Sequence, residues 1–464
     1  MIKTWYSIKK EQQRFFMAKE GSLDAPTRHP ILWQDENYSD LEQLQTEAER
    51  QFDVCHGCRR CFNLCGSFPK LFDLIDDSAT GELDSVDKNS YEDVVDECTL
   101  CDMCYMTKCP YVPPHEFNID FPHLMLRYKA YQFKNNKVDL SKKILADSDT
   151  VGKISSTFSP VVNRLNASQI GRKVIEKVMK VDQSADLPKY SHKTLIKLIK
   201  EQPIQPNSDG VAFGESILLY PGCFCNYNDV EMGYQAYQIL SFFGVKVNMR
   251  YEGCCGMPHL ENGNIEKVHQ SSIAISQKIN AQNIVSDKVV CVVPSCSLMM
   301  KKEWPLIAHD NQEVKLFSQN VEDFFEYLVM LVKKYGMPTI LSQNKEVQKI
   351  TLHLACHSRA QNMGAKAAEF FRLISNIQVS VIERCSGHGG IWGFLKKNFN
   401  YAIKFAKPVV RQIKKEEQSI VSSECPLALS HIHQAFEKLS EPQDEVKNII
   451  SKTPIKILAD LLGL

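Results

Sequence analysis

Short apolar runs and amphipathic segments alternate along the second half of this 464-residue chain. The apolar runs in Glu215–Cys225 and Gln348–His357 have the character of β-strands, and each leads into a cysteine. Stretches with helical spacing, such as Gln270–Asn283, lie between runs of this kind. Strands that alternate with helices predict α/β units built on parallel sheets.

This half of the chain contains an internal repeat. Phe243–Gly256 resembles Ile374–Gly387, and Lys288–Met299 resembles Gln418–Ala428. A nearly constant offset of about 130 positions relates the two copies, which indicates a duplication. The matched cysteine pairs are Cys223 and Cys356, Cys254 and Cys385, and Cys296 and Cys425. We expect these cysteines just after strand ends, where α/β sheets place their ligands.

The segment before the repeat, residues 126–210, is predicted to be a helical connector. Gln169–Val181 has an apolar stripe at helical spacing, formed by Ile170, Val174, Val178 and Val181. Between Lys142 and Lys200, twelve Lys and Arg residues outnumber five acidic residues. A basic amphipathic segment of this kind can lie on an anionic membrane surface. The simpler interpretation is a solvated connector helix that packs on the protein core.

The pattern divides the chain into six segments. They are an N-terminal extension with a charged helix (residues 1–50), a cysteine-rich helical region (51–125), the connector (126–210), two α/β modules (211–335 and 345–440) and a C-terminal helix (441–464).

Composition and charge argue against several classes of protein. Basic and acidic residues both number 55, so a nucleic-acid partner held by phosphate contacts is not expected. With 24% charged and 44% hydrophobic residues, the chain is expected to be globular. Met1–Ser22 lacks the apolar core of a secretory signal, and no apolar run is long enough to span a membrane. We therefore expect a cytoplasmic protein, with peripheral contact at the inner face of the cell membrane if the connector binds lipid.

The seventeen cysteines are the most unusual feature of the composition. Cysteines in a reducing cytoplasm seldom form disulfides, so metal binding is the favoured use of these thiols. Eight of them lie in two runs, Cys55-x2-Cys58-x2-Cys61-x3-Cys65 and Cys98-x2-Cys101-x2-Cys104-x4-Cys109.

The spacing of the two runs is that of two-cluster ferredoxins, in which the fourth cysteine of each run binds the other cluster. It predicts one [4Fe–4S] cluster on Cys55, Cys58, Cys61 and Cys109, and a second on Cys65, Cys98, Cys101 and Cys104. Two structural zinc sites are the alternative, because zinc also accepts four thiolates.

Several motifs give the chain a family resemblance: the two cysteine runs, Lys108–Arg127 (KCPYVPPHEFNIDFPHLMLR), Cys254–Pro258 (CCGMP) and Cys385–Phe394 (CSGHGGIWGF). The chain resembles the C-subunits of anaerobic glycerol-3-phosphate dehydrogenase, within the wider set of glycolate oxidase iron–sulfur subunits and heterodisulfide reductase cysteine-rich subunits. The resemblance spans about residues 50–440. It implies an α+β multidomain protein, in which an α-helical two-[4Fe–4S] ferredoxin-like domain precedes two repeated α/β cysteine-rich (CCG) modules.

The family's CCG pattern is a cysteine, then CCG, then a terminal CxxC, and each module can hold a further iron–sulfur cluster. Val293 stands in place of one CxxC cysteine in the first module, where Cys225 and Cys291 are near enough in sequence to substitute. In the second module Ser386 and Ser422 replace cysteines. The resemblance implies the ligand sets Cys223, Cys254, Cys255 and Cys296, and Cys356, Cys385 and Cys425.

Three thiols cannot give four-cysteine ligation in the second module. Either a histidine, a serine or water completes the site, or the site holds no full cluster. His357 and His388 lie close to ligand cysteines in sequence, and the simpler interpretation is that they bond a nearby sulfur or carbonyl. The same interpretation applies to His56 and His259. One or two clusters are therefore expected in the modules, beyond the two [4Fe–4S] clusters.

The sequence shows no motif for oxidising a substrate. No Gly-x-Gly-x-x-Gly follows an expected strand, and there is no P-loop or Gly-x-Ser-x-Gly elbow. The resemblance implies a non-catalytic electron-transfer subunit that takes electrons from a flavoprotein dehydrogenase and passes them towards quinone. The dehydrogenase would oxidise glycerol 3-phosphate or a 2-hydroxy acid such as glycolate or lactate.

Two other functions remain open from the sequence. The first is a heterodisulfide reductase-like catalytic subunit that reduces a disulfide at a non-cubane cluster in the CCG region. The second is a structural zinc protein without a redox role.

Overall fold

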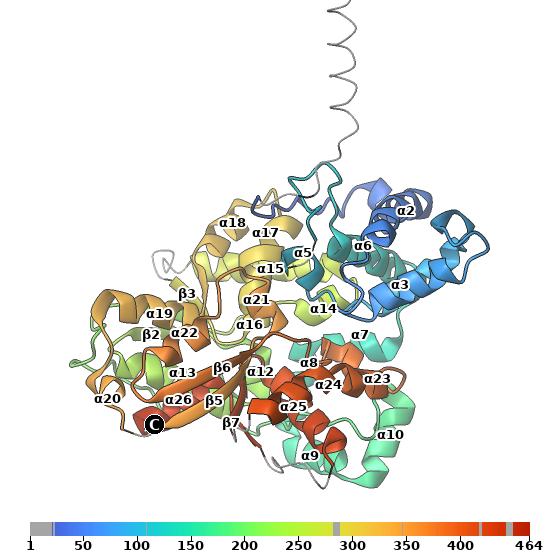
Figure 1. Ribbon diagram of the computed structural model, residues 1–464. Helices are drawn as coiled ribbons and strands as arrows, with labels where there is room; N and C mark the ends of the chain where they lie inside the picture. Colours follow the sequence, from blue (N-terminus) through green and yellow to red (C-terminus); the bar gives the residue numbers. More distant parts are fainter. Residues whose placement is uncertain are drawn as a thin grey trace, which may run out of the picture.

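The computed structural model describes Gly21 and residues 24–107, 109–281, 288–345, 347–416, 420–441 and 449–464 (Figure 1). The charged helix expected at the start of the chain, and nearly all of Met1–Ser22, lie outside these residues. The protein has many helices and two parallel sheets, which confirms the mixed α/β part of the expected fold class.

The N-terminal helical part, residues 24–134, consists of short helices separated by the cysteine-bearing loops. Its longest helix starts after Asp40, whose side chain accepts a hydrogen bond from the Gln43 N–H, and ends where Arg59 adopts a left-handed φ of 49°. The helices are α2 (Leu41–Cys58), α3 (Ser67–Asp76), α4 (Tyr91–Asp96), α5 (Met103–Thr107) and α6 (Phe121–Lys134), with 3₁₀ turns η1 (Glu36–Ser39), η2 (Leu83–Ser85) and η3 (Lys88–Ser90).

The connector consists of five helices: α7 (Leu140–Ala146), α8 (Ser148–Thr157), α9 (Ser159–Ala167), α10 (Gln169–Met179) and α11 (Leu195–Glu201). The helix predicted over residues 169–181 is confirmed by α10 to within two residues.

The apolar stripe of α10 faces solvent. Ile170 is 80% exposed, Val174 56% and Val178 64%, whereas Val181, just beyond the helix, is buried. The opposite side of α10 carries Arg172, whose guanidinium donates hydrogen bonds to backbone carbonyls of the following loop. Ile175 and Met179, on the other side of α10, pack against buried side chains, so the helix lies on the core while most of its apolar stripe stays exposed.

The first sheet consists of β1 (Ser216–Tyr220), β2 (Lys246–Met249), β3 (Lys288–Cys291) and β4 (Val321–Asp323). The strands are parallel and lie in the order β2-β1-β3-β4. Because β2 lies on one side of β1 and β3 on the other, the order of the strands reverses between β1 and β3. Crevices at such switch points, outside the carboxyl ends of the strands, are where open α/β sheets bind ligands.

The second sheet repeats this arrangement. It consists of β5 (Gln348–His353), β6 (Ile377–Ile382), β7 (Ile420–Ser423) and β8 (Ile450–Ser451), all parallel, in the order β6-β5-β7-β8. The fourth strand, β8, comes from the segment beyond residue 440, so the second sheet extends past the range of 345–440 expected for the module.

Helices connect and cover the strands. Around the first sheet they are α12 (Gly222–Tyr227), α13 (Val230–Phe242), α14 (Met257–Glu261), α15 (Ile265–Asn280), α16 (Pro294–Leu298), the π-helical turn η4 (Met299–Glu303), α17 (Trp304–Ile307), α18 (Gln312–Gln319), α19 (Phe324–Tyr335) and α20 (Thr339–Ser342). Around the second they are α21 (Cys356–Arg359), α22 (Lys366–Arg372), the 3₁₀ turn η5 (Gly390–Phe394), α23 (Phe399–Phe405), α24 (Lys407–Glu416) and α25 (Pro426–Leu439). The last helix, α26 (Pro454–Leu462), packs against α13 beside the first sheet.

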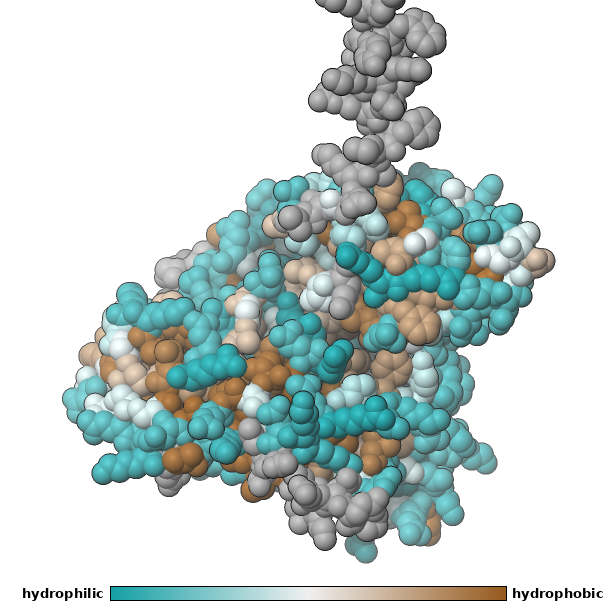
Figure 2. Space-filling view, viewed as in Figure 1, coloured by the Kyte–Doolittle hydropathy of each residue, from teal (hydrophilic) through white to brown (hydrophobic). Residues whose placement is uncertain are grey.

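One hydrophobic core joins the N-terminal helical part to both sheets. The same cluster of buried side chains includes Phe52 from α2, Leu218 from β1 and Leu352 from β5. A smaller cluster lies between the connector and the helices of the second sheet, with Val181 and Val421 among its members. Most of the surface in Figure 2 is hydrophilic, and hydrophobic side chains gather on its left part, near α19, α20 and α22.

A buried ionic cluster ties the start of the described chain to this core. The guanidinium of Arg28 donates hydrogen bonds to Asp102 at 2.8 and 2.9 Å, to Asp120 at 3.1 Å and to Glu303 at 3.0 Å. His123 contacts the second carboxylate oxygen of Glu303 at 3.2 Å. Burial opposes ionisation of Glu303, but His123 and Arg28 outweigh it and lower its pKa to about 2. The cluster joins the cysteine loop that contains Asp102 to η4.

We expect the substitution Arg28→Ala to lower the free energy of unfolding by about 3–5 kcal/mol, because it leaves buried carboxylates without their cation. Chemical denaturation of the anaerobically purified protein measures this change. The control is Lys452→Ala, which removes an exposed pair with Asp460 (2.6 Å) and is expected to cost about 0–1 kcal/mol. Equal effects of the two substitutions would contradict the structural role of Arg28.

Candidate iron–sulfur site

In the first sheet, a cysteine follows the carboxyl end of each of three neighbouring strands. Cys223 follows β1, Cys254 and Cys255 follow β2, and Cys296 follows β3. Because parallel strands end at the same edge of a sheet, these thiols are brought to one place although they are far apart in sequence.

The second sheet places its cysteines in the same way. Cys356 follows β5, Cys385 follows β6, and Cys425 follows β7. Cys425 is the N-cap of α25, so the N-terminus of this helix lies at its thiol. Backbone N–H groups of Leu427 and Ala428 accordingly act to stabilise the thiolate of Cys425, although burial raises the pKa of this thiol overall.

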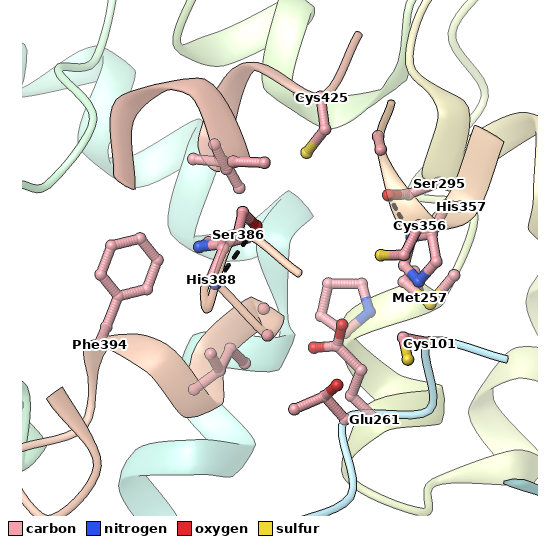
Figure 3. A pocket seen from close by; sticks show the side chains of 18 of the residues that line it. Cys101, Met257, Glu261, Ser295, Cys356, His357, Ser386, His388, Phe394 and Cys425 are labelled. Atoms are coloured by element: carbon pink, nitrogen blue, oxygen red, sulfur yellow. Dashed lines mark hydrogen bonds between the residues drawn. The ribbon is translucent and has the colours of Figure 1, made fainter. Parts of the chain in front are cut away.

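A cavity of about 1320 Å³ lies between the two sets of strand ends. In Figure 3 the sulfur atoms of Cys356 and Cys425 point into the same open space, which Glu261 and His388 also border. A thiol of the N-terminal helical part, Cys101, reaches its wall as well. The thiols that line the cavity are Cys101, Cys223, Cys254, Cys255, Cys296, Cys356, Cys385 and Cys425.

The four thiols of the first sheet lie close together. The Sγ atoms of Cys223 and Cys254 are 3.8 Å apart. A side chain at Gly222 would come within 2.8 Å of the Cys296 sulfur, so this position requires glycine both for space and for its φ of 73°. Hydrogen bonds with Cys223 and Cys255 hold the pKa of the Cys254 thiol well below its usual range.

Groups outside the cysteine motifs hold the turn at Cys254 and Cys255. The buried indole of Trp304 donates a hydrogen bond to the Cys255 carbonyl at 2.9 Å. From the connector, the carboxylate of Asp149 accepts a hydrogen bond from the Cys254 N–H at 2.7 Å and another from the Tyr251 hydroxyl. Asp149 was not among the residues expected from the sequence, and nothing in its local sequence marks it, because its role depends on the packing of α8 against the first sheet.

The thiols of the second sheet also lie near one another. Burial raises the pKa of Cys356 well above its usual range, and the nearby thiols of Cys101, Cys385 and Cys425 raise it further. The Gly387 N–H donates to the Cys385 sulfur at 3.3 Å. The structure therefore brings together the three thiols expected in this module and adds Cys101 to their surroundings.

The structure also groups the first ligand set expected in the N-terminal helical part. Burial raises the pKa of Cys55 well above its usual range, and the thiols of Cys109, Cys61 and Cys58 add to this effect. All four of these cysteines line one small cavity beside Phe68 and Phe72.

The second ligand set is grouped around Cys65 and Cys104. Burial raises the pKa of the Cys65 thiol, and the neighbouring thiols of Cys101 and Cys98 raise it further. Burial likewise raises the pKa of Cys104, with contributions from Cys101, Cys65, Cys61 and Cys98. The loop between Cys98 and Cys104 contains two residues other than glycine with left-handed backbones, Leu100 (φ 51°) and Asp102 (φ 62°). Such conformations concentrate at functional sites, and here the Arg28 cluster holds one of them.

The donor chemistry of these sets fits iron–sulfur clusters. The thiolate is the form that binds metal, and burial disfavours this charged form unless a cation compensates it. Groups of buried thiols are therefore expected to be stable as thiolates only with bound metal. Within the described ranges, no three His, Cys, Asp or Glu side chains converge on one point as the ligands of a single metal ion would.

Other residues singled out from the sequence lie outside the cavity. Cys225 and Cys291, which were near enough in sequence to substitute as ligands, are fully buried, and neither is among the described residues that line the cavity. The Cys291 sulfur instead contacts the Met300 sulfur at 3.7 Å. His56 contacts Arg59 and Glu82 at the surface of the N-terminal helical part, and burial lowers the pKa of His259.

Glu261, which the sequence did not single out, projects into the cavity from the end of α14 (Figure 3). Burial raises the pKa of this carboxyl to about 7, although Lys129 and the Ile391 N–H act to lower it. A side chain at Gly390 would come within 2.3 Å of the Glu261 carboxylate, so the two modules meet closely at this point.

Comparison with known proteins identifies a known domain around the thiols of the first sheet. Residues 217–301 match the family model of the CCG cysteine-rich domain. The match covers β1 to β3 and contains Cys223, Cys254, Cys255 and Cys296. The CCG domain thus coincides with the strands that bring these four thiols to the cavity.

Curated relatives extend the similarity beyond the CCG domain. The chain is 24% identical over 298 residues to the C-subunit of anaerobic glycerol-3-phosphate dehydrogenase of Escherichia coli K12, covering 63% of this chain and 73% of that protein. It is 23% identical over 265 residues to the D-subunit of dihydromethanophenazine:CoB–CoM heterodisulfide reductase of Methanosarcina mazei, covering 53% and 59%. Citrate utilization protein B of Escherichia coli is 32% identical over 94 residues, covering 20% and 22%. These findings confirm the resemblance inferred from the motifs.

Glu261 provides a test of the cavity's electrostatics. Its carboxyl has a raised pKa in the folded protein. The folded state therefore binds more protons than the unfolded state at pH values between the ordinary pKa of a glutamate and about 7. Wild-type stability therefore falls as the pH rises through this range. We expect Glu261→Gln, which keeps the acceptor oxygen and removes the charge, to melt at a higher temperature than wild type at pH 8 and at a similar temperature at pH 5.

Anaerobic thermal denaturation across this pH range measures the difference. The control is Glu266→Gln, an exposed position in α15, for which no pH-dependent difference from wild type is expected. If the melting temperatures of Glu261→Gln and wild type differed by the same amount at every pH, the raised pKa would be contradicted.

Proposed function

We propose that this chain is an iron–sulfur electron-transfer subunit of an oxidoreductase complex. The observation that carries the proposal is the position of Cys101, which belongs to the second ferredoxin-type ligand set and also lines the cavity between the two sheets. When bound, iron–sulfur clusters at these thiols would supply one-electron redox chemistry.

The four thiol sets form a continuous series. Cys61 of the first set is near enough to Cys104 of the second to raise its pKa. Cys385 at the second sheet acts in the same way on Cys101, whose pKa burial raises to about 12. The last step of the proposed electron path crosses the cavity, because both the thiols of the second sheet and those of the CCG domain line its walls. This order supports a path from Cys55 through Cys101 to the CCG domain.

The electron donor we propose is a flavin-dependent dehydrogenase that oxidises glycerol 3-phosphate or a 2-hydroxy acid such as glycolate or lactate, with quinone as the eventual acceptor. The support is the similarity to a dehydrogenase subunit named for glycerol 3-phosphate. The purified chain alone is expected not to reduce an artificial acceptor with any of these substrates, and to do so only with a flavoprotein partner. Activity of the chain by itself would contradict this role.

The cluster content gives the most direct test. Iron and acid-labile sulfide analysis of anaerobically purified protein is expected to give at least about eight irons per chain, and about twelve or more if the sites at the sheets are loaded. We expect Cys101→Ser to lose about four of these irons, because it removes one thiolate of the second set. Electron paramagnetic resonance of the reduced protein should also show less magnetic interaction between the remaining centres.

The matched control is Cys225→Ser, which removes a buried thiol that lies outside the cavity and is expected to keep the full iron content. Equal iron loss in both variants would contradict the assignment of Cys101. A colourless protein that contains zinc and no iron would contradict the electron-transfer function and support structural zinc sites.

The cavity also favours a second candidate function, reduction of a disulfide. Its volume of about 1320 Å³ is large enough for a small-molecule substrate beside two thiol sets, and one relative belongs to a heterodisulfide reductase. Cleavage of a thiol disulfide by the reduced, cluster-loaded chain would support this alternative. A disulfide that stays intact would contradict it, and electron transfer would remain as the proposed function.

We propose in addition that the connector binds the inner face of the cell membrane as a peripheral contact. None of the helices in the described ranges combines the length and hydropathy needed to cross a bilayer. Exposed apolar side chains nevertheless recur along α8, α9 and α10 and at the junction of α8 and α9, among them Phe158, Val161 and Ile170. Exposed basic residues such as Lys173 and Lys177 flank them, which is the combination that binds anionic lipid surfaces.

Vesicle binding tests this contact. Replacing Ile170, Val174 and Val178 together by serine is expected to weaken binding to phosphatidylglycerol-containing vesicles about tenfold or more, because it removes three side chains that would enter the lipid. The control replaces three exposed apolar residues elsewhere, Ile340, Val347 and Leu373, and is expected to bind as wild type does. Failure of the wild-type chain to bind such vesicles, or equal weakening in both variants, would contradict membrane contact.

A further inference from the structure

The thiol set of the second sheet lacks a fourth cysteine. Ser422 and Ser386 occupy two of the positions at which the resemblance implies cysteines. Ser422 lies in β7, is fully buried and is not among the described residues that line the cavity, so it cannot complete the site. Ser386 does line the cavity, and its hydroxyl accepts a hydrogen bond from the His388 N–H at 3.4 Å.

Three histidines line the cavity beside this set, and hydrogen bonds occupy both ring nitrogens of one and a single ring nitrogen of another. The two ring nitrogens of His353 bond the Ser423 hydroxyl at 3.0 Å and the Arg384 carbonyl at 2.9 Å. His357 bonds the Ser295 hydroxyl through Nδ1 at 2.8 Å.

His388 differs from both. Its side chain lines the cavity and is only 7% exposed, yet its Nδ1 atom is buried without a hydrogen-bond partner among the described residues. The nearest rings are those of Phe394, with centroids 5.2 Å apart, and His431, at 6.2 Å. An imidazole in this environment is neutral, because burial lowers its pKa to about 3. A buried polar group without a partner is costly unless a ligand satisfies it.

The backbone around His388 is built to hold it in place. Gly387 and Gly389 have left-handed φ values of 78° and 56°. A side chain at Gly387 would come within 2.2 Å of the Ala402 carbonyl, and one at Gly393 within 1.9 Å of the carbonyl of His388 itself. The loop after Cys385 is therefore closely packed on α23 and η5, which fixes the imidazole at the cavity wall (Figure 3).

We propose that His388 is the fourth ligand of an iron–sulfur cluster held at the second sheet by Cys356, Cys385 and Cys425. The proposal rests on the electron-transfer function proposed above. An imidazole in place of a thiolate removes one negative charge from the ligand set, and histidine ligation raises the reduction potential of iron–sulfur centres. This site would then attract electrons from the neighbouring four-thiolate set that contains Cys101.

Nitrogen hyperfine coupling tests the proposal directly. The full chain is loaded anaerobically with iron and sulfide, with either natural or 15N-labelled histidine, reduced, and studied by pulsed electron paramagnetic resonance. We expect a strongly coupled nitrogen whose signal changes with the label in wild type. The signal is expected to be lost in both His388→Cys and His388→Ala.

Iron content and potential give independent readouts. His388→Ala is expected to lose about four irons, whereas His388→Cys keeps them and shifts one midpoint potential to a lower value. Two control variants, Ser386→Ala and His357→Gln, alter the other polar groups at the site and are expected to keep both the iron and the nitrogen signal.

The outcomes separate this proposal from the electron-transfer function. If the N-terminal clusters load and wild type shows no further cluster, or a further cluster without histidine coupling, the assignment of His388 is overturned and the electron-transfer function stands. Iron loss in Ser386→Ala with retention in His388→Ala would make serine the ligand and overturn the proposal. Absence of iron throughout would overturn the electron-transfer function itself.

Discussion

Parallel strand pairing is the constraint on which the site depends. In each sheet three neighbouring strands end at one edge, and each is followed within a few residues by a cysteine. Hydrogen bonding between β1, β2 and β3 therefore brings together thiols as distant in sequence as Cys223 and Cys296. The same geometry operates at β5, β6 and β7, and the two edges enclose a common cavity. Without this pairing, the sheet cysteines would be isolated buried thiols.

Much of this arrangement could be predicted, because cysteine spacing reports on local loops and strand ends. The thiols around Cys55 and those around Cys65 lie in the groups that the ferredoxin-type spacing predicts. The repeat in the sequence predicts two sheets with matching cysteines, and the strand orders correspond. These features depend on residues within short segments, where sequence patterns are most informative.

The remaining features depend on contacts between distant segments. Asp149 supports the Cys254 turn only because α8 packs against the first sheet, and Glu261 enters the cavity only because α14 meets the loop at Gly390. Arg28 binds carboxylates contributed by three separate elements. The stripe on α10 has a helical periodicity that predicts the helix, but periodicity identifies an apolar side and cannot say whether protein covers it, and most of this side is exposed.

The walls of the cavity come from residues as far apart as Arg60 and Ala428. During synthesis the chain emerges from its N-terminal side, so this chamber cannot close until the segment that contains Ala428 has left the ribosome. The first ligand set expected from the sequence is complete once Cys109 has emerged. The thiols at the two sheets are all present only once Cys425 has emerged. Metal and sulfide for a centre at the sheets would therefore have to be delivered after both repeats have been translated.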